Sequence, residues 1–214
     1  SDGNFRLPEV NAYKDPAEMP RCDTVIVALK TTANEVLPSI LPHLIKDDGI
    51  VLSLQNGLGS EEEMAAIVGS DSVLGGLCFL CSNKVGPGHT RHLDYGLVTI
   101  GEYRSDGKAA GITPRLEGLG ADLRTAGIQT RLEDDLALAR WKKLVWNIPF
   151  NGLCALTGLP TNQLLGCPET RQLITEIMQE VIAAANQQGL SEAIDATATI
   201  EPMLQATAGM GAYR

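Results

Sequence analysis

The stretch "CDTVIVALK", residues 22–30, is a short run of apolar and β-branched residues that ends in a lysine. An uninterrupted run of this length is typical of a strand buried on both faces, as in the parallel sheet of an α/β protein. The stretch "GIVLSLQNG", residues 49–57, repeats the pattern and ends in a polar, turn-forming tip. Apolar residues at helical spacing lie between them, at 33–45, and Thr31 or Thr32 is the expected cap of this helix. This alternation of strand and helix predicts an α/β fold.

The alternation continues to about residue 134 and then stops. The further elements expected in this part are a helix at 60–69 capped by Ser60, a strand at 72–82, a turn at 86–89 followed by an antiparallel strand, a helix at 112–126 and a strand at 128–134. From about Asp135 onward only helical patterns remain. We therefore predict a partial Rossmann-type, parallel α/β domain at 1–134 and an all-helical domain at 135–214.

The charge balance limits the partners that the protein can have. The chain carries 17 basic and 26 acidic residues, a net charge of −9, which argues against nucleic acid or an anionic membrane as the main partner. No apolar stretch approaches the ~18 residues needed to cross a bilayer. The opening residues lack the pattern of a signal peptide, so the cytoplasm is the expected compartment.

The five cysteines do not read as a disulfide framework, because their number is odd and they are scattered along the chain. Cys78 and Cys81 form a C-x-x-C pair, but neither a second pair nor a histidine at ligand spacing completes a zinc site. We expect these two cysteines to be buried structural residues, and we predict no metal site.

Polar residues follow two successive strands of the predicted sheet, at the points where the strands end. Lys30 follows the first strand and Asn56 lies in the tip of the second. A parallel sheet binds ligands at the carboxyl ends of its strands, so these residues are candidates for a site. The alternative is a surface lysine and an ordinary turn.

The stretch "WKKLVWNIPFN", residues 141–151, places Lys143, Asn147 and Asn151 at steps of four. On a helix each such step advances about 40°, so the three side chains form one narrow polar stripe among apolar neighbours. The polar stripe is either a structural hydrogen-bond ladder or the wall of a site. Pro149 lacks an N–H, and a kink there would redirect Asn151 relative to Lys143.

Taken together, "DTVIVALKTT", "LSLQNGLG", "GPG" before "GLVTIGEY", and "WKKLVWNIPFNGLCALT" resemble the ketopantoate reductases in order and spacing, over roughly residues 1–190. These are NADPH-dependent enzymes that reduce 2-dehydropantoate to pantoate on the route to coenzyme A. The resemblance therefore implies an oxidoreductase with NADPH as its cofactor and a small 2-oxoacid as its substrate.

The resemblance also implies roles for individual residues. Lys143 corresponds to the proton donor, Asn147 and Asn151 to substrate-binding asparagines, and Lys30 and Asn56 to residues near the nicotinamide end of the cofactor. The chemistry agrees, because an ammonium can stabilise the charge that grows on a ketone oxygen and pass it a proton. Partial desolvation beside tryptophans is expected to lower the pKa of such a lysine.

The sequence departs from the family pattern in three places. It contains no G-x-G-x-x-G motif, so we expect two preceding βα units, about 60 to 70 residues, to be absent from this chain. Residues 201–214 hold Met203 but not the serine and aspartate that the family carries there, so we expect the C-terminal end to be absent too. Thr161, followed by Asn162, stands where the family often has a substrate-binding asparagine, and we predict Thr161 as a substrate contact.

Two other functions stay open at this point. One is a related lysine-dependent dehydrogenase acting on other 2-oxoacids or on 3-hydroxy acids, since such enzymes also pair a helical lysine with an asparagine four residues later. The other is a non-catalytic protein that keeps the scaffold to bind a ligand or partner. A homodimer is possible through the apolar run at 171–185, although packing into a core explains that run equally well.

Overall fold

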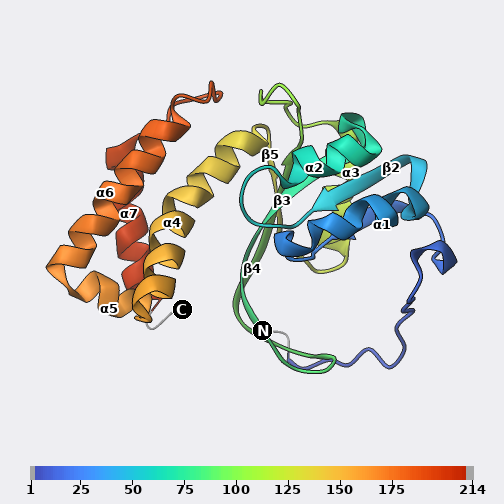
Figure 1. Cartoon of the computed structure of the whole chain (residues 1–214), viewed down its shortest axis with the longest axis horizontal. Coiled ribbons are helices and arrows are strands. Elements are labelled where there is room, and N and C mark those ends of the chain that lie inside the picture. The colour runs from blue at the N-terminus through green and yellow to red at the C-terminus, as the bar shows by residue number, and fades with distance from the viewer. Residues whose placement is uncertain (1–2, 211–214) are drawn as a thin grey trace. The chain divides into compact units, whose positions relative to one another are not determined.

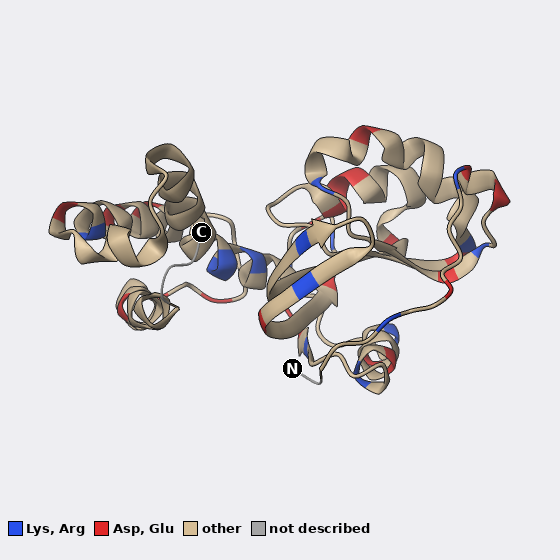
Figure 2. Ribbon diagram, turned by 90° about the horizontal axis from the view of Figure 1, so that it is seen from below, with Lys and Arg blue, Asp and Glu red and all other residues tan. Residues whose placement is uncertain are grey.

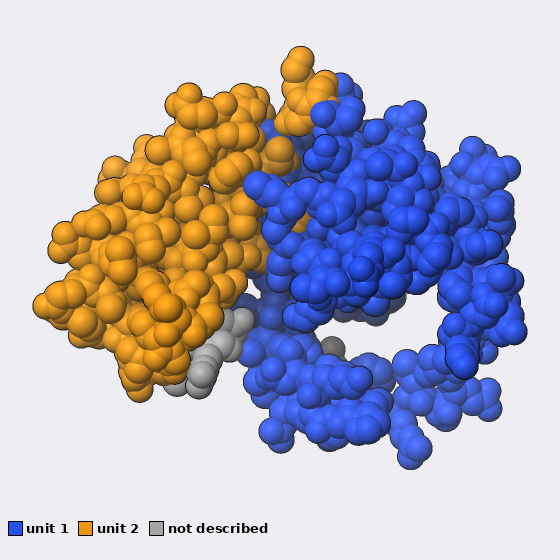
Figure 3. Space-filling model, viewed as in Figure 1, with its two compact units in different colours: residues 1–105, 110–136 blue, residues 106–109, 137–214 orange. Residues whose placement is uncertain are grey.

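The computed structural model describes residues 3–210 and divides into two compact units. One unit consists of residues 1–105 and 110–136, and the other of residues 106–109 and 137–214 (Figure 3). All the strands lie in the first unit, and the second is built from helices (Figure 1). The division into functional domains at 1–134 and 135–214 stays a prediction. Residues 1–2 of the first range and 211–214 of the second lie outside the described residues.

The elements follow the order that the sequence pattern predicts. The strands are β1 (Cys22–Val27), β2 (Ile45–Ser53), β3 (Val73–Gly86), β4 (His89–Glu102) and β5 (Thr130–Glu133). The helices are α1 (Leu37–Leu44), α2 (Ser60–Val68), α3 (Pro114–Thr125), α4 (Leu136–Thr157), α5 (Thr161–Gly166), α6 (Pro168–Ala185) and α7 (Ala196–Gly209), with three short 3-10 helices besides. Helices α4 to α7 all lie in the part from about residue 135 onward, for which only helices were predicted.

The five strands form one sheet in the order β1-β2-β3-β4-β5. The pairs β1–β2, β2–β3 and β4–β5 are parallel, and β3–β4 is antiparallel, so the sheet is mixed. Strands β3 and β4 make the predicted hairpin, whose outer half runs on as a two-stranded ribbon (Figure 1). The antiparallel strand was expected, and the sheet is otherwise parallel as predicted.

Helices cover both faces of this sheet. Adjacent residues of a strand point to opposite faces, so Val51 and Leu52 belong to different cores. Val51 packs with α1 and α2 through Leu41 and Met64, whereas Leu52 packs with α3 through Leu116. Burial on both faces explains why the first strands read as continuous apolar runs rather than as an alternation.

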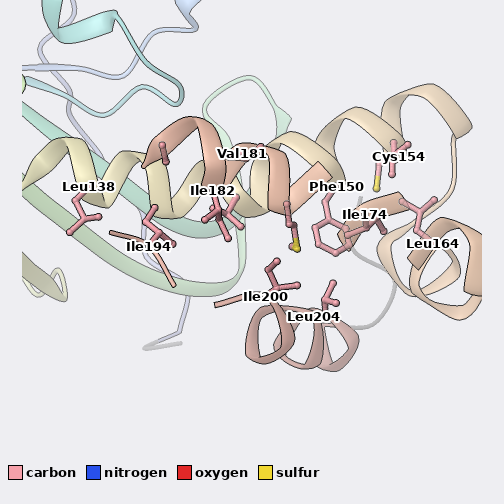
Figure 4. Close-up of a cluster of buried hydrophobic side chains, with 14 residues drawn as sticks. Leu138, Phe150, Cys154, Leu164, Ile174, Val181, Ile182, Ile194, Ile200 and Leu204 are labelled. Atoms are coloured by element: carbon pink, nitrogen blue, oxygen red, sulfur yellow. The ribbon is translucent and has the colours of Figure 1, made fainter. Parts of the chain in front are cut away.

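The helical unit has a core of its own, to which each of its helices contributes. Figure 4 shows Phe150 of α4, Ile174 and Ile182 of α6, and Leu204 of α7 pointing into one cluster. The apolar side of α6 is used here, since its buried residues face this cluster. Packing within the unit thus accounts for the apolar run at 171–185, and a homodimer stays a prediction.

The cysteines differ in part from expectation. All five are thiols, as the odd, scattered pattern predicts. Cys78 and Cys81, however, are partly exposed, so the prediction that both are buried is wrong. They lie on β3 where it leaves the covered part of the sheet, and the register shift between Phe79 and Leu80 interrupts the regular alternation between them.

A charged pair stabilises the first unit, between Glu102 at the end of β4 and Arg115 in the first turn of α3. The Glu102 side chain is 3% exposed and accepts hydrogen bonds from Arg115 Nε at 2.9 and 3.1 Å and from the Thr113 hydroxyl. Replacing Arg115 by alanine leaves a buried carboxylate without its cation. Because the Arg115 side chain is itself 36% exposed, we expect a loss of about 2 to 3 kcal/mol in the free energy of unfolding, measured by urea denaturation with far-UV circular dichroism.

The matched control is Arg131→Ala, which removes the cation of the more exposed Arg131–Glu133 pair in the same unit. Exposed pairs contribute about 0 to 1 kcal/mol, so this variant should unfold almost as the parent does. If Arg115→Ala costs no more than the control, Glu102 is stabilised by groups other than Arg115.

Candidate active site

Lys30 and Asn56 lie at the same edge of the sheet. Strands β1 and β2 are parallel neighbours with Val27 opposite Ser53, and the Leu54 N–H donates to the Val27 carbonyl at 2.9 Å. Each predicted residue lies three positions beyond this last pair, and both are exposed. The structure therefore brings Lys30 and Asn56 to one place, which we call the cofactor-side edge.

The loop that carries Asn56 depends on two glycines. Gly57 and Gly59 have φ angles of 96° and 91°, which are left-handed values that favour glycine. Helix α2 starts directly after the loop, with Gly59 as its N-cap. The prediction of a Ser60 cap is wrong, because Ser60 is the first helical residue and its side chain is buried. The first turn of α2 carries three acidic residues, Glu61 to Glu63.

A hydrogen-bond network that the sequence did not reveal lies directly behind this edge. Gln55 Nε2 donates to the Leu29 carbonyl at 2.8 Å and to Asn34 Oδ1 at 2.7 Å. Asn34 Nδ2 in turn donates to Glu63 Oε2 at 2.6 Å. The partners are 21 to 29 positions apart, so no local pattern could have found them. The expected Thr31 or Thr32 cap is also wrong, because η2 (Thr31–Val36) has Lys30 as its N-cap.

The acidic first turn of α2 also acts on Tyr103, at the end of β4. Burial first, and then the charges of Glu62 and Glu61, raise the pKa of the Tyr103 phenol above 10.0. The neutral phenol is thus favoured in the folded state, so its contribution to stability is present below the unfolded pKa and is lost as the pH rises through the folded one.

We expect the absorbance titration of the protein at 295 nm, minus that of Tyr103→Phe, to show a midpoint above the ordinary tyrosine value. Glu62→Gln should move this midpoint down, because it removes one of the two charges. A difference midpoint at or below the ordinary value would contradict the assignment.

The polar stripe lies on α4, which runs unbroken through Pro149. Lys143 and Asn147 are half-buried, whereas Asn151 is exposed. The 40° drift of a four-residue step explains this order, because the apolar face of α4 is centred near Trp146 and Phe150. Each successive member of the stripe therefore turns further from the core, and the predicted kink is not needed to expose Asn151.

Two neighbours hold the stripe's helix in place. Phe150 is fully buried and stacks on Trp146, with ring centroids 5.0 Å apart. The Trp146 indole donates to the Thr207 hydroxyl of α7 at 2.8 Å. Lys142, beside Lys143 in the sequence, is exposed and pairs with Glu192 at 2.8 Å.

Thr161 differs from the other predicted substrate contacts because it is fully buried. It is the first residue of α5, a helix whose Leu164 also packs into the helical core. Its burial fits a part in holding α5, and Thr161 as a substrate contact stays a prediction.

Charged residues of both signs are interspersed along the ribbons of both units (Figure 2). Within residues 3–210, no group of three or more histidine, cysteine or acidic side chains is arranged to hold a metal ion. In the same range, no helix has the length and apolar character that a membrane span requires.

Comparison with known proteins supplies the family. Residues 1–105 match the family model described as ketopantoate reductase PanE/ApbA, and residues 135–212 match that of its C-terminal part. A 2-dehydropantoate 2-reductase of Nostoc is 52% identical over 213 residues, which is 100% of this chain and 66% of the relative. One of Halobacterium salinarum is 29% identical over 89% of this chain and 61% of its own length.

A solved structure supports the same relationship. The crystal structure of 2-dehydropantoate 2-reductase from Geobacter metallireducens superimposes with a TM-score of 0.93 at 44% identity, covering 99% of this chain and 68% of that one. The chain thus spans about two thirds, or slightly less, of the length of the curated relatives that it matches. The mixed sheet followed by helices agrees with these matches, and so does the polar stripe. The chain therefore belongs to the ketopantoate reductase PanE/ApbA family.

Proposed function

We propose that this chain is part of an NADPH-dependent 2-dehydropantoate 2-reductase, which reduces the ketone of 2-dehydropantoate to the alcohol of pantoate. The observation that carries the proposal is the 52% identity to the Nostoc enzyme over the whole chain. The polar stripe supports it, because a cation and two amides are the groups that a 2-oxoacid requires.

In this proposal the polar stripe binds the substrate. The amides of Asn147 and Asn151 can donate to a carboxylate or carbonyl and accept from a hydroxyl, and 2-dehydropantoate has all three groups. Lys143 places its ammonium beside the ketone oxygen, stabilises the negative charge that grows there and donates the proton that completes the alcohol. Thr161 is the third proposed substrate contact, at the start of α5.

The cofactor-side edge receives the nicotinamide end of the cofactor. Bound NADPH supplies the hydride, and NADP⁺ is left after the transfer. Lys30 and Asn56 fit this role, because both are exposed and polar at the carboxyl ends of adjacent parallel strands, where such sheets bind nucleotides. The residues for the pyrophosphate belong to the G-x-G-x-x-G motif, which this sequence does not contain.

The test is NADPH oxidation by the complete protein, followed at 340 nm, with 2-dehydropantoate and a panel of other branched 2-oxoacids. Reduction of 2-dehydropantoate with the highest kcat/KM of the panel is the expected result. Preference for another 2-oxoacid, or NADP⁺ reduction with a 3-hydroxy acid, would identify a related dehydrogenase instead. Absence of any turnover would favour a non-catalytic scaffold.

A further inference from the structure

We infer that Gln55, Asn34 and Glu63 are positioning residues, which fix the two loops that present Lys30 and Asn56 to the cofactor. This inference rests on the proposed function, since it assumes that the cofactor-side edge binds a nicotinamide nucleotide. The three residues lie in unit 1 and come from the loop after β2, the 3-10 helix after β1 and the first turn of α2.

The first step is the bond from Gln55 to the backbone. Gln55 immediately precedes Asn56, and the carbonyl to which its Nε2 donates, that of Leu29, immediately precedes Lys30. One side chain therefore couples the backbone next to both predicted cofactor contacts. The Gln55 residue is 4% exposed, and a hydrogen bond shielded from water in this way is stronger than one at the surface.

The second step is that the donor and the acceptor of each hydrogen bond in this network are determined. The Leu29 carbonyl and the Glu63 carboxylate are both acceptors only. Asn34 must therefore turn its Nδ2 toward Glu63, at 2.6 Å, which leaves its Oδ1 to accept from Gln55 Nε2, at 2.7 Å. The bond to Glu63 is charge-assisted, which strengthens the end of the network that reaches the surface.

The third step links the network to cofactor binding. Lys30 and Asn56 are exposed loop residues, and ordering such residues on binding costs conformational entropy. A network that holds both loops in the free protein removes part of this cost. Loosening it should weaken NADPH binding, and it should leave the contacts of the oxoacid with the polar stripe, on a different element, unchanged.

Asn34→Asp tests this with almost no change in shape. The variant keeps the acceptor for Gln55 but brings two carboxylates together where Asn34 and Glu63 are 2.6 Å apart. We expect the Kd for NADPH, measured by fluorescence titration of the complete protein, to rise about tenfold, as for the loss of one good hydrogen bond. The KM for the oxoacid should stay within about twofold of the parent value.

The decisive variant is the exchange Asn34→Asp with Glu63→Gln. Here the glutamine amide donates to the aspartate, so the bond is restored with its polarity reversed, and the Kd should return to within about threefold of the parent value. Glu63→Gln alone should change the Kd little, because Asn34 can still donate to the amide oxygen. Glu35→Gln is the matched control, since it neutralises an exposed carboxylate next to Asn34 that is outside the network.

Thermal unfolding of each variant separates positioning from mere stability. A Kd that stays within twofold of the parent in Asn34→Asp, whether or not the melting temperature falls, overturns the inference. So does a double variant that does not recover. Failure of the proposed function looks different, because the parent protein itself would then not bind NADPH, and the inference would fall with it.

Discussion

Lys143→Ala is expected to lower kcat for reduction of the 2-oxoacid by about 10²- to 10⁴-fold, the usual contribution of a positioned general acid. The variant loses both the proton donor and the positive charge beside the ketone oxygen. Lys143 is half-buried on a helix whose core face is formed by other residues, so removing its side chain should leave the fold intact. Steady-state NADPH oxidation, with circular dichroism as a check of folding, measures this.

The neighbouring Lys142 provides the matched control for this experiment. It has the same side chain on the same helix, but it is exposed and pairs with Glu192. Lys142→Ala removes an exposed ion pair, which contributes about 0 to 1 kcal/mol, so turnover should stay near the parent value. Equal turnover in Lys143→Ala and Lys142→Ala would exclude Lys143 as the proton donor and leave the polar stripe with a binding role only.

Phe150→Ala should have the largest effect on stability, a loss of about 3 to 5 kcal/mol in the free energy of unfolding of the helical unit. Phe150 is fully buried, stacks on Trp146 and lies in the central cluster of the unit (Figure 4). Alanine would leave a cavity there in addition to the lost burial of the ring. Both tryptophans of the protein, Trp141 and Trp146, are on α4, so urea denaturation followed by tryptophan fluorescence reports on this unit directly.

Ile148→Ala is the comparison for Phe150→Ala. Ile148 lies two residues away on α4 but is 45% exposed, so its truncation should cost less than about 1 kcal/mol. Phe150→Leu should fall between the two, since it keeps part of the buried volume. A loss below about 1 kcal/mol in Phe150→Ala would mean that the cluster closes over the gap, and that the ring is not what holds the stripe's helix in place.

The candidate site could be predicted from the sequence only as separate pieces. Lys30 and Asn56 were found because each follows a buried strand, and parallel strands deliver their ends to one edge. Lys143, Asn147 and Asn151 were found because a four-residue step keeps one side of a helix. Asn34 and Glu63 were missed, since their importance comes from contact with a buried glutamine far away in the chain. The roles of all these residues in binding and catalysis stay predictions.

The kind and order of the long elements follow from local sequence patterns, because periodicity and turn residues act over a few neighbouring positions. The buried runs became β1 and β2, the glycine and proline turn became the β3–β4 hairpin, and α4 and α6 followed their apolar spacing. The same local signals misplaced the caps at Ser60 and at Thr31 or Thr32, where glycine geometry and the preceding loop decide where the helix begins.

Which groups meet, and which are shielded from water, depends on how distant parts of the chain pack together. The partial exposure of Cys78 and Cys81 depends on where the hairpin leaves the covered sheet, and the burial of Thr161 depends on how α5 packs in its unit. The bonds of Gln55 depend on two loops folding back on each other. Burial and long-range hydrogen bonds belong to pairs of residues distant in the chain, so no single stretch of sequence contains them.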